Sequence, residues 1–199
     1  MTRALQKPVV LPRSFYLDSP EIVARALLGK LITHHREGER LTGRITEVEA
    51  YLGFADPASH TYAGRTDRNS VLFGPPGFAY VYFIYGMHYC LNVSCLPDGQ
   101  PGGVLFRALE PVEGLETMAE LRGLPSGVKP ELLTGGPGRL TQALGITRAP
   151  INGIDVTLRG SPLQILDDGY RPDHIDVTPR IGISKAADRL LRFVVNKKK

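Results

Sequence analysis

Aromatic and β-branched side chains are concentrated between residues 79 and 93, where half of the chain's eight tyrosines lie. Such side chains favour strands over helices. Gly86 interrupts this run near its middle, and glycine permits a chain reversal at little cost. The pattern therefore predicts two antiparallel strands, with residues 85–88 at the tip of the hairpin between them.

Side chains alternate between the two faces of a strand. Tyr80, Tyr82 and Ile84 should therefore share one face of the hairpin, while Tyr85 sits at the reversal, where its ring can project. Two interpretations of these rings stay open. They can form an aromatic stripe in the core, which is the commoner case, or a surface that stacks a flat molecule beside a protruding wedge.

A second alternating segment, residues 41–52, carries acidic side chains. In an extended chain Glu47, Glu49 and Tyr51 share one face, and the opposite face is apolar. Alternating glutamates usually mark a solvated strand face, where Glu47 would pair with a basic neighbour. The functional alternative is a cleft in which an acid or base lies beside an aromatic wall.

Shorter patterns predict the remaining elements. Ser19 can cap a helix that has Pro20 at its first position and ends at Gly29. In the predicted strand at 31–35, His34 and His35 face opposite ways and are interpreted as surface residues. Further helices are expected at residues 113–121 and 140–144, and further strands at residues 104–109, 155–158, 163–166 and 190–195. Together these elements predict an α+β fold in a single mixed domain, residues 1–199.

Two polar segments are candidates for binding. Residues 53–76 form a long polar connection that contains His60 and Arg68, and long loops in compact domains are often functional. Residues 135–138 are rich in glycine and open a helix that carries Arg139, which is a possible phosphate seat. Taken alone this second pattern is weak, because glycine and proline open many helices.

Charge and cysteine content narrow the class of protein. Lysine and arginine total 24 against 20 acidic residues, a net charge of +4, which permits a polyanionic partner without requiring one. No apolar signal region is seen near the N-terminus, and no stretch is long enough to span a membrane, so we expect a soluble cytoplasmic protein. Cys90 and Cys95 are expected to be buried thiols in a reducing compartment.

The candidate residues suggest hydrolysis next to a flat leaving group. Arg107 is charged within an apolar run and needs a carboxylate or an anionic substrate nearby. A carboxylate such as Glu49 can deprotonate water and stabilise oxocarbenium character at a sugar carbon. Aromatic rings hold a flat base, more tightly if it is cationic. An enzyme that reaches a base inside a duplex must extrude it and fill the gap, and Tyr85 is placed to do so.

Several motifs closely resemble the alkyladenine (3-methyladenine) DNA glycosylase family. They lie, in the family's order, at residues 47–53, 68–69, 80–87, 91–93 and 107–111. Further similarity at residues 114–118, 136–137 and 191–193 extends the resemblance over nearly the whole chain. Residues 146–179 match poorly.

The resemblance implies a fold, an activity and a partner. The family fold is a single mixed α+β domain around a curved antiparallel β-sheet flanked by helices, with a protruding β-hairpin. The family's activity is that of a monofunctional DNA glycosylase of base excision repair. It acts on damaged purines in double-stranded DNA, such as 3-methyladenine, 7-methylguanine, hypoxanthine and ethenoadenine, and leaves an abasic site. No metal or other cofactor is expected, and the protein is expected to be a monomer.

The resemblance also implies a role for each candidate residue. Glu49 would activate the water with help from Arg107, and Asn92 on the pocket floor would disfavour the exocyclic amine of normal guanine. Tyr85 would intercalate in the DNA. The residues implied to sandwich the extruded base are Tyr51, His60 and Tyr82. The residues implied to contact the DNA around it are Thr66, Arg68, Met87, His88 and Arg139.

Two rival functions remain open. A non-catalytic nucleic-acid-binding module could stack bases on an aromatic sheet without any chemistry. An enzyme acting on free nucleosides is a third possibility, although the basic loop around Arg65 and Arg68 argues against it. Within the glycosylase interpretation, no lysine stands at the matched pocket positions, so a Schiff-base lyase step is not expected.

Overall fold

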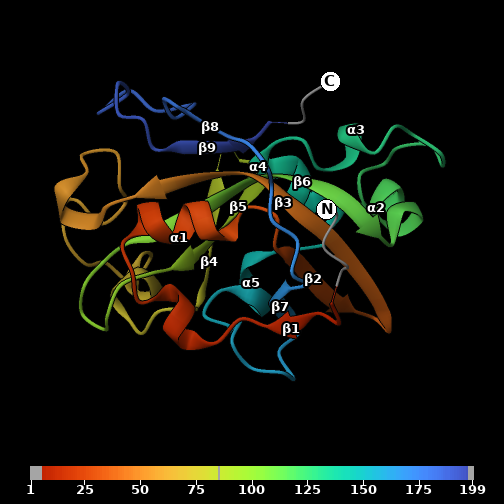
Figure 1. The fold of residues 1–199 in the computed structure, drawn as a ribbon, viewed down its shortest axis with the longest axis horizontal. Coiled ribbons are helices and arrows are strands. Elements are labelled where there is room, and N and C mark those ends of the chain that lie inside the picture. The colour runs from red at the N-terminus through yellow and green to blue at the C-terminus, as the bar shows by residue number, and fades with distance from the viewer. Residues whose placement is uncertain (1–5, 85, 197–199) are drawn as a thin grey trace.

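The computed structural model describes residues 6–84 and 86–196, and in them a nine-stranded antiparallel sheet with five α-helices (Figure 1). The strands are β1 (Val9–Val10), β2 (Leu31–Arg36), β3 (Glu39–Tyr51), β4 (Ala79–Ile84), β5 (His88–Ser94), β6 (Gly103–Glu113), β7 (Leu163–Asp167), β8 (Ile175–Thr178) and β9 (Arg192–Val195). The helices are α1 (Pro20–Leu27), α2 (Leu115–Leu121), α3 (Glu131–Thr134), α4 (Pro137–Ala143) and α5 (Arg148–Ile151). The predicted α+β class, one mixed unit around a curved antiparallel sheet, is confirmed.

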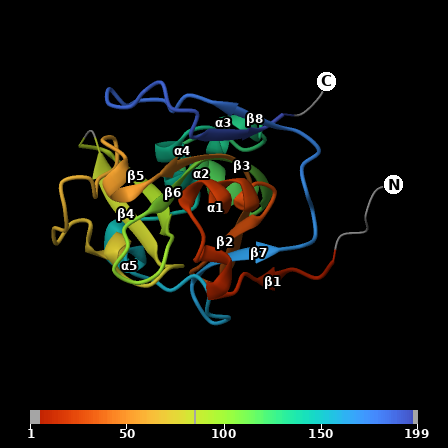
Figure 2. The same cartoon turned by 60° about the vertical axis from the view of Figure 1, so that its left-hand side comes forward.

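Strand β3 is the centre of the sheet. It pairs with β6 along one edge, and along the other edge first with β2 and then with β9. Its register with β6 shifts between Ile45 and Val48, and such irregularities bend and twist a strand. The half of β3 that carries Glu47 and Glu49 therefore lies beyond its pairing with β2, where its pairing with β9 begins. The C-terminal β8–β9 pair reaches this place through a long connection from β7, drawn in blue in Figures 1 and 2.

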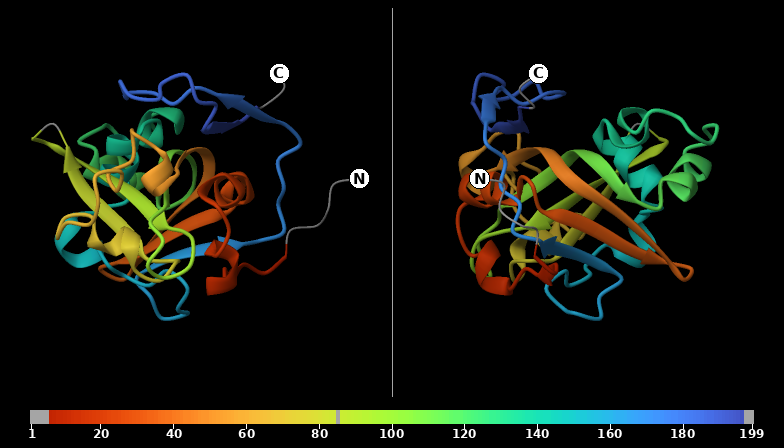
Figure 3. Two further views of the ribbon diagram at one scale, coloured as in Figure 1. Left: turned by 90° about the vertical axis from the view of Figure 1, so that its left-hand side faces the viewer. Right: turned by 45° about the vertical axis from the view of Figure 1, so that its right-hand side comes forward.

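The aromatic run forms the predicted hairpin. Strands β4 and β5 are joined by a turn in which the Met87 amide donates to the Ile84 carbonyl at 3.2 Å. Gly86 has a φ of +70°, a conformation that glycine adopts without strain. The hairpin lies at the end of the sheet, and its tip reaches the margin of the molecule in the left panel of Figure 3. Tyr85, the expected intercalating residue, lies outside the described residues.

Helices pack on the sheet and complete one core. Ser19 caps α1, with its Oγ accepting from the Ile22 amide at 3.5 Å, and Val23 and Leu27 of α1 are buried against β3. Burial of each such side chain stabilises the fold by about 1.5–3 kcal/mol. Helix α4 packs on β5 and β6 and so fixes the hairpin relative to β6.

The structure corrects four predictions. His34 is buried, not exposed, because its side chain packs against the end of α4, where its Nδ1 lies 2.7 Å from the Leu144 carbonyl. Residues 155–158 form a turn in place of a strand, since the Asp155 carboxylate accepts from the Thr157 amide at 2.9 Å. The helix expected at 113–121 begins only at Leu115, and the helix expected at 140–144 begins already at Pro137.

Two expectations from composition can be compared with the structure. Cys90 and Cys95 are free and buried, as expected. Among the helices of residues 6–84 and 86–196, none is long and apolar enough to cross a membrane.

Candidate active site

A pocket of about 360 Å³ opens between the end of β3, the β4–β5 hairpin and the segment 181–183. Its size falls within the usual range for small-ligand sites. The residues of interest that line it are Tyr51, His60, Tyr80, Tyr82, Asn92, Arg107 and Ile181. The interpretation of the tyrosine run as core alone is therefore wrong: Tyr80 is buried, but Tyr82 and Ile84 share its face and line an open cavity, as the alternation predicts.

Glu49 lies beneath this pocket with no exposed surface. Its Oε2 accepts from the Tyr51 hydroxyl at 2.9 Å, and its Oε1 accepts from the Ile181 amide at 2.8 Å. Arg107 Nη1 lies 3.3 Å from the same Oε1. Burial raises the pKa of Glu49 above its ordinary value, although Arg107 and the two hydrogen bonds partly offset it. A raised carboxyl pKa in a pocket is the usual condition of a catalytic acid or base.

Glu47 is the second carboxylate of the strand, and two arginines share one of its oxygens. Its Oε1 accepts from Arg107 Nε at 2.9 Å and from Arg192 Nε at 2.6 Å. The predicted ion-pair role of Glu47 is therefore confirmed. Arg107 is shared between the two glutamates, which fixes its guanidinium at the mouth of the Glu49 site.

The aromatic residues form two walls, and His60 and Tyr82 belong to the same one. Their ring centroids are 4.5 Å apart at an angle of 69°, so no base fits between them. His60 Nδ1 is 3.1 Å from the Tyr80 hydroxyl, which holds the imidazole at the rim. Desolvation and then Arg68 lower the pKa of His60, so the ring is neutral near pH 7. A flat base would lie between this wall and Tyr51.

Asn92 and Cys90 extend the pocket surface on β5. The Asn92 Nδ2 donates to the Tyr80 carbonyl at 3.2 Å, which fixes the direction of its carboxamide. Burial raises the pKa of Cys90 above its ordinary value, so this thiol stays protonated. Asn92 therefore presents a rigid polar group to whatever enters the pocket.

The candidate DNA contacts lie on three segments, which are the loop after β3, the β4–β5 hairpin and the start of α4. Thr66 and Arg68 are exposed on the loop after β3, and Arg68 lies 5.7 Å from the centre of the Tyr82 ring. Met87 is 70% exposed on the hairpin, while His88 is half-buried against Gly138 at the start of α4. Arg139 is exposed on α4. The Gly136 amide donates to the Arg107 carbonyl at 2.9 Å, so it is not free to hold a phosphate.

Three residues that sequence reasoning left out hold the site together. Asn69 is buried, and its carboxamide bonds the His60 carbonyl and the Thr66 amide at 2.9 and 2.7 Å, which fixes the loop. Asp56 and Arg180 form a buried ion pair next to Tyr51. The only sequence signal for Arg180 was a charged residue in the run 179–183, which includes the pocket residue Ile181.

Gly53 explains how the loop can begin directly after β3. It has a φ of +65°, and a Cβ at this position would overlap the Pro101 carbonyl oxygen. Only glycine fits such a position. In the described residues, no group of three or more His, Cys, Asp or Glu side chains is arranged to hold a metal ion.

A buried carboxylate beside an arginine and an aromatic pocket suits hydrolysis next to a flat ring. Comparison with known proteins gives the family. A family model described as Methylpurine-DNA glycosylase (MPG) matches residues 14–199, and the chain belongs to this family.

Relatives agree with this assignment. A protein of Koribacter versatilis is 56% identical over 186 residues, 93% of this chain and 89% of the relative. Proteins of Methanoculleus marisnigri and Burkholderia lata are 50% and 47% identical, and the matches cover 93% and 94% of this chain and 94% and 87% of those relatives. All three carry the name "Putative 3-methyladenine DNA glycosylase". The predicted family and enzyme class, a DNA glycosylase, are confirmed.

Proposed function

We propose that this enzyme is a monofunctional glycosylase of base excision repair that hydrolyses the N-glycosidic bond of damaged purines in double-stranded DNA. Its substrates are alkylated and deaminated purines of the 3-methyladenine, 7-methylguanine, hypoxanthine and ethenoadenine class, and its DNA product is an abasic site. The observation that carries the proposal is the 2.9 Å hydrogen bond from Tyr51 to Glu49, because it joins the stacking ring to the buried carboxylate.

Glu49 is the carboxylate that acts in the reaction. The extruded purine stacks between Tyr51 and the wall of His60 and Tyr82, and its sugar carbon C1′ faces Glu49. Glu49 takes a proton from water as the water oxygen bonds to C1′, and the C1′–N bond breaks with its electron pair leaving on the purine. A cationic alkylated purine departs neutral, whereas a neutral purine takes one further proton from solvent.

The remaining residues select and hold the substrate. Arg107, kept in place by Glu47, stabilises the ionised Glu49 and the water beside it. Asn92 presents a fixed carboxamide to the purine edge and disfavours the exocyclic amine of normal guanine. No lysine is required, because water is the nucleophile.

The surface around the pocket binds the duplex. Tyr85 enters the base stack and fills the space that the purine vacates. The residues that contact the surrounding DNA are Thr66, Arg68, Met87, His88 and Arg139. The enzyme acts as a monomer, in the cytoplasm where it reaches the nucleoid.

The rival, a module that only stacks bases, is less well supported. Stacking needs rings and basic residues, but it has no use for a buried carboxylate held against the stacking ring by Tyr51, Arg107 and the Ile181 amide.

Glu49→Gln tests the proposal. Single-turnover release of base is measured from four duplexes, each with one of the four lesions, and the variant should be slower by at least about 100-fold, since it cannot take a proton. Its affinity for the same duplexes should change little. Glu113→Gln is the control, because Glu113 pairs with Arg40 at the opposite end of β6.

Two outcomes would decide against the proposal. Normal turnover by Glu49→Gln would refute water activation by this residue. Tight, salt-dependent binding by the wild-type protein without release of any base would favour the stacking module.

A further inference from the structure

A buried ion pair lies directly behind Tyr51, on the segment that leads to Ile181. Arg180 Nη1 and Nη2 donate to the two Asp56 oxygens at 2.5 and 2.8 Å, and both side chains are fully buried. The guanidinium carbon is 4.6 Å from the centre of the Tyr51 ring. The ring therefore stands between the pocket and a buried charge pair.

The pair joins the end of β3, the loop after it and the segment that leads to Ile181. Arg180 Nη1 also donates to the Ala50 carbonyl of β3 at 3.0 Å. Asp56 accepts from the Leu52 and Ala58 amides, both at 3.2 Å, and so shapes the start of the loop that carries His60. The residue after Arg180 is Ile181, whose amide binds Glu49. One ion pair thus sets the positions of both groups that donate to the catalytic carboxylate.

Stability alone does not account for this pair. Buried ion pairs contribute little net stability, because desolvation offsets their attraction. Arg180 also has an Nε with no hydrogen-bond partner among the residues that the structure describes, which is a further cost. A costly buried group beside a binding wall points to a role at the site.

Charge balance gives that role. A cation behind an aromatic ring opposes the binding of a second cation to its other face, because both draw on the same ring quadrupole. Arg180 alone would therefore make the Tyr51 wall poor at holding a cationic base. Asp56, bound to the guanidinium at two points, cancels this effect.

We propose that Arg180 and Asp56 are positioning residues that back Tyr51 with a neutral pair, which orients the ring and the Ile181 amide and keeps the pocket open to cationic bases. The inference deepens the proposed function and rests on it for the orientation of the base. It also makes Asp56 a specificity-determining residue, since its loss should affect charged and neutral bases differently.

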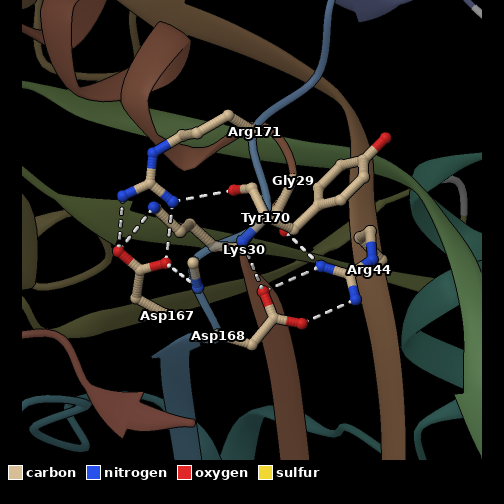
Figure 4. A network of polar contacts seen from close by, with 8 residues as sticks. Gly29, Lys30, Arg44, Asp167, Asp168, Tyr170 and Arg171 are labelled. Carbon is tan, nitrogen blue, oxygen red and sulfur yellow. Dashed lines mark hydrogen bonds and ion pairs between the residues drawn. The ribbon is translucent and has the colours of Figure 1, made fainter. Parts of the chain in front are cut away.

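The chain provides a matched control. Arg44 donates to the two Asp168 oxygens at 3.1 and 2.7 Å and to the Gly29 carbonyl at 2.7 Å, and its guanidinium carbon is 4.5 Å from the centre of the Tyr170 ring (Figure 4). These residues do not line the pocket. Asp168→Asn therefore removes the same kind of charge without touching the site.

The test compares binding to duplexes that contain 7-methylguanine, which is cationic, or hypoxanthine, which is neutral. All variants are made in the Glu49→Gln background so that no base is released. Asp56→Asn should lower the preference for 7-methylguanine over hypoxanthine by about tenfold, from the Coulomb repulsion of an unpaired buried cation. Asp56→Asn with Arg180→Met should restore the preference to within about twofold, because both charges are gone. Asp168→Asn should leave it unchanged.

Positioning has a second readout in the otherwise wild-type enzyme. The double variant loses the contacts that hold Tyr51 and Ile181 against Glu49, so release of hypoxanthine should slow by about tenfold and its acid limb should move to higher pH. Rates and an acid limb equal to the wild-type values would overturn positioning. A folded Asp56→Asn protein with an unchanged binding preference would overturn the charge argument. If Asp56→Asn does not fold, Arg180→Met leaves Asp56 as an unpaired buried anion and should raise the preference for 7-methylguanine, and an unchanged preference again overturns the charge argument.

Failure of the proposed function is a separate result. A wild-type protein that releases neither base refutes the glycosylase mechanism. The binding preference needs no chemistry and still decides the inference: an equal preference in every variant overturns it.

Discussion

Two clusters in this protein are built from the same three residue types, yet only one of them adjoins the pocket. In each, an arginine is held by both oxygens of a buried aspartate, donates to a backbone carbonyl and lies over a tyrosine ring. The clusters are Arg180–Asp56–Tyr51 and Arg44–Asp168–Tyr170. The distances from guanidinium carbon to ring centre, 4.6 and 4.5 Å, are nearly equal.

The tyrosine makes the difference. Tyr51 donates its hydroxyl to Glu49 and presents its ring to the pocket, whereas Tyr170 is 36% exposed and bonds the Asp168 carboxylate through its backbone amide. The Tyr170 cluster joins the end of β7 to β2 and β3, together with the pair of Lys30 and Asp167. The comparison teaches that an arginine–aspartate–tyrosine cluster is not a site by itself: its neighbours decide its role.

The largest expected effect is on stability, at the cluster away from the pocket. Asp168→Asn leaves the largely buried Arg44 charge without its partner, and we expect a loss of about 3 kcal/mol in the free energy of unfolding. Urea denaturation measures it. Base release per folded molecule should stay at the wild-type rate, and a reduced rate would show that this cluster also acts on the site.

The next effect separates the two tyrosines. Tyr51→Phe removes a hydrogen bond to an ionised group, which contributes about 1.5–3 kcal/mol, so kcat should fall at least about tenfold. Tyr170→Phe keeps the ring under Arg44 and should leave kcat within about twofold of wild type. Single-turnover rates on one duplex compare them, and equal rates for both variants would contradict the role of Tyr51.

A third expectation concerns pH, because the pKa of Glu49 is raised and the pKa of Asp168 is lowered. Burial raises the pKa of Glu49, so activity that needs its ionised form should fall with decreasing pH already above the ordinary glutamate value of about 4.3. Burial by itself would raise the pKa of Asp168, but Arg44 and hydrogen bonds lower it. Its contribution to stability is therefore present above its unfolded pKa and lost only as pH falls through its lower folded pKa.

Measurements of kcat and of the free energy of unfolding in urea, both as functions of pH, check which of the two is lost first. Activity should disappear at a higher pH than the stability from Asp168. An acid limb of kcat below about pH 4 would contradict ionised Glu49 as the base, because its pKa is raised.

The smallest expected effect is at the exposed edge of the cluster away from the pocket. Arg171 pairs with Asp167 at 2.8 Å, but its side chain is 55% exposed. Arg171→Ala should cost less than about 1 kcal/mol of stability and leave base release unchanged. A thermal melt measures the first, and a loss of several kcal/mol would mean that Arg171 helps hold Lys30 in its buried pair.

The local pattern was sufficient for the elements that carry most of the site. Alternation along residues 41–52 and 79–93 predicted the strand with Glu49 and Tyr51 and the hairpin with Tyr80 and Tyr82, because side-chain direction in a strand follows from sequence spacing alone. The motifs along these strands also indicated the family. The sequence predicts that Glu47 pairs with a basic neighbour, but it does not identify Arg107 and Arg192 as the partners.

Only the tertiary structure decided which distant residues complete the site. Ile181 lies 132 positions from the Glu49 carboxylate that it binds, and Arg180 lies 124 positions from Asp56. The pairing of β9 with β3 brings them there, and no local period encodes such a pairing. His34 was misjudged for the same reason, since the alternation of a strand gives the face of a side chain but not what covers that face. Sequence periodicity fixes directions within an element, whereas burial and charge pairing depend on how separate elements pack.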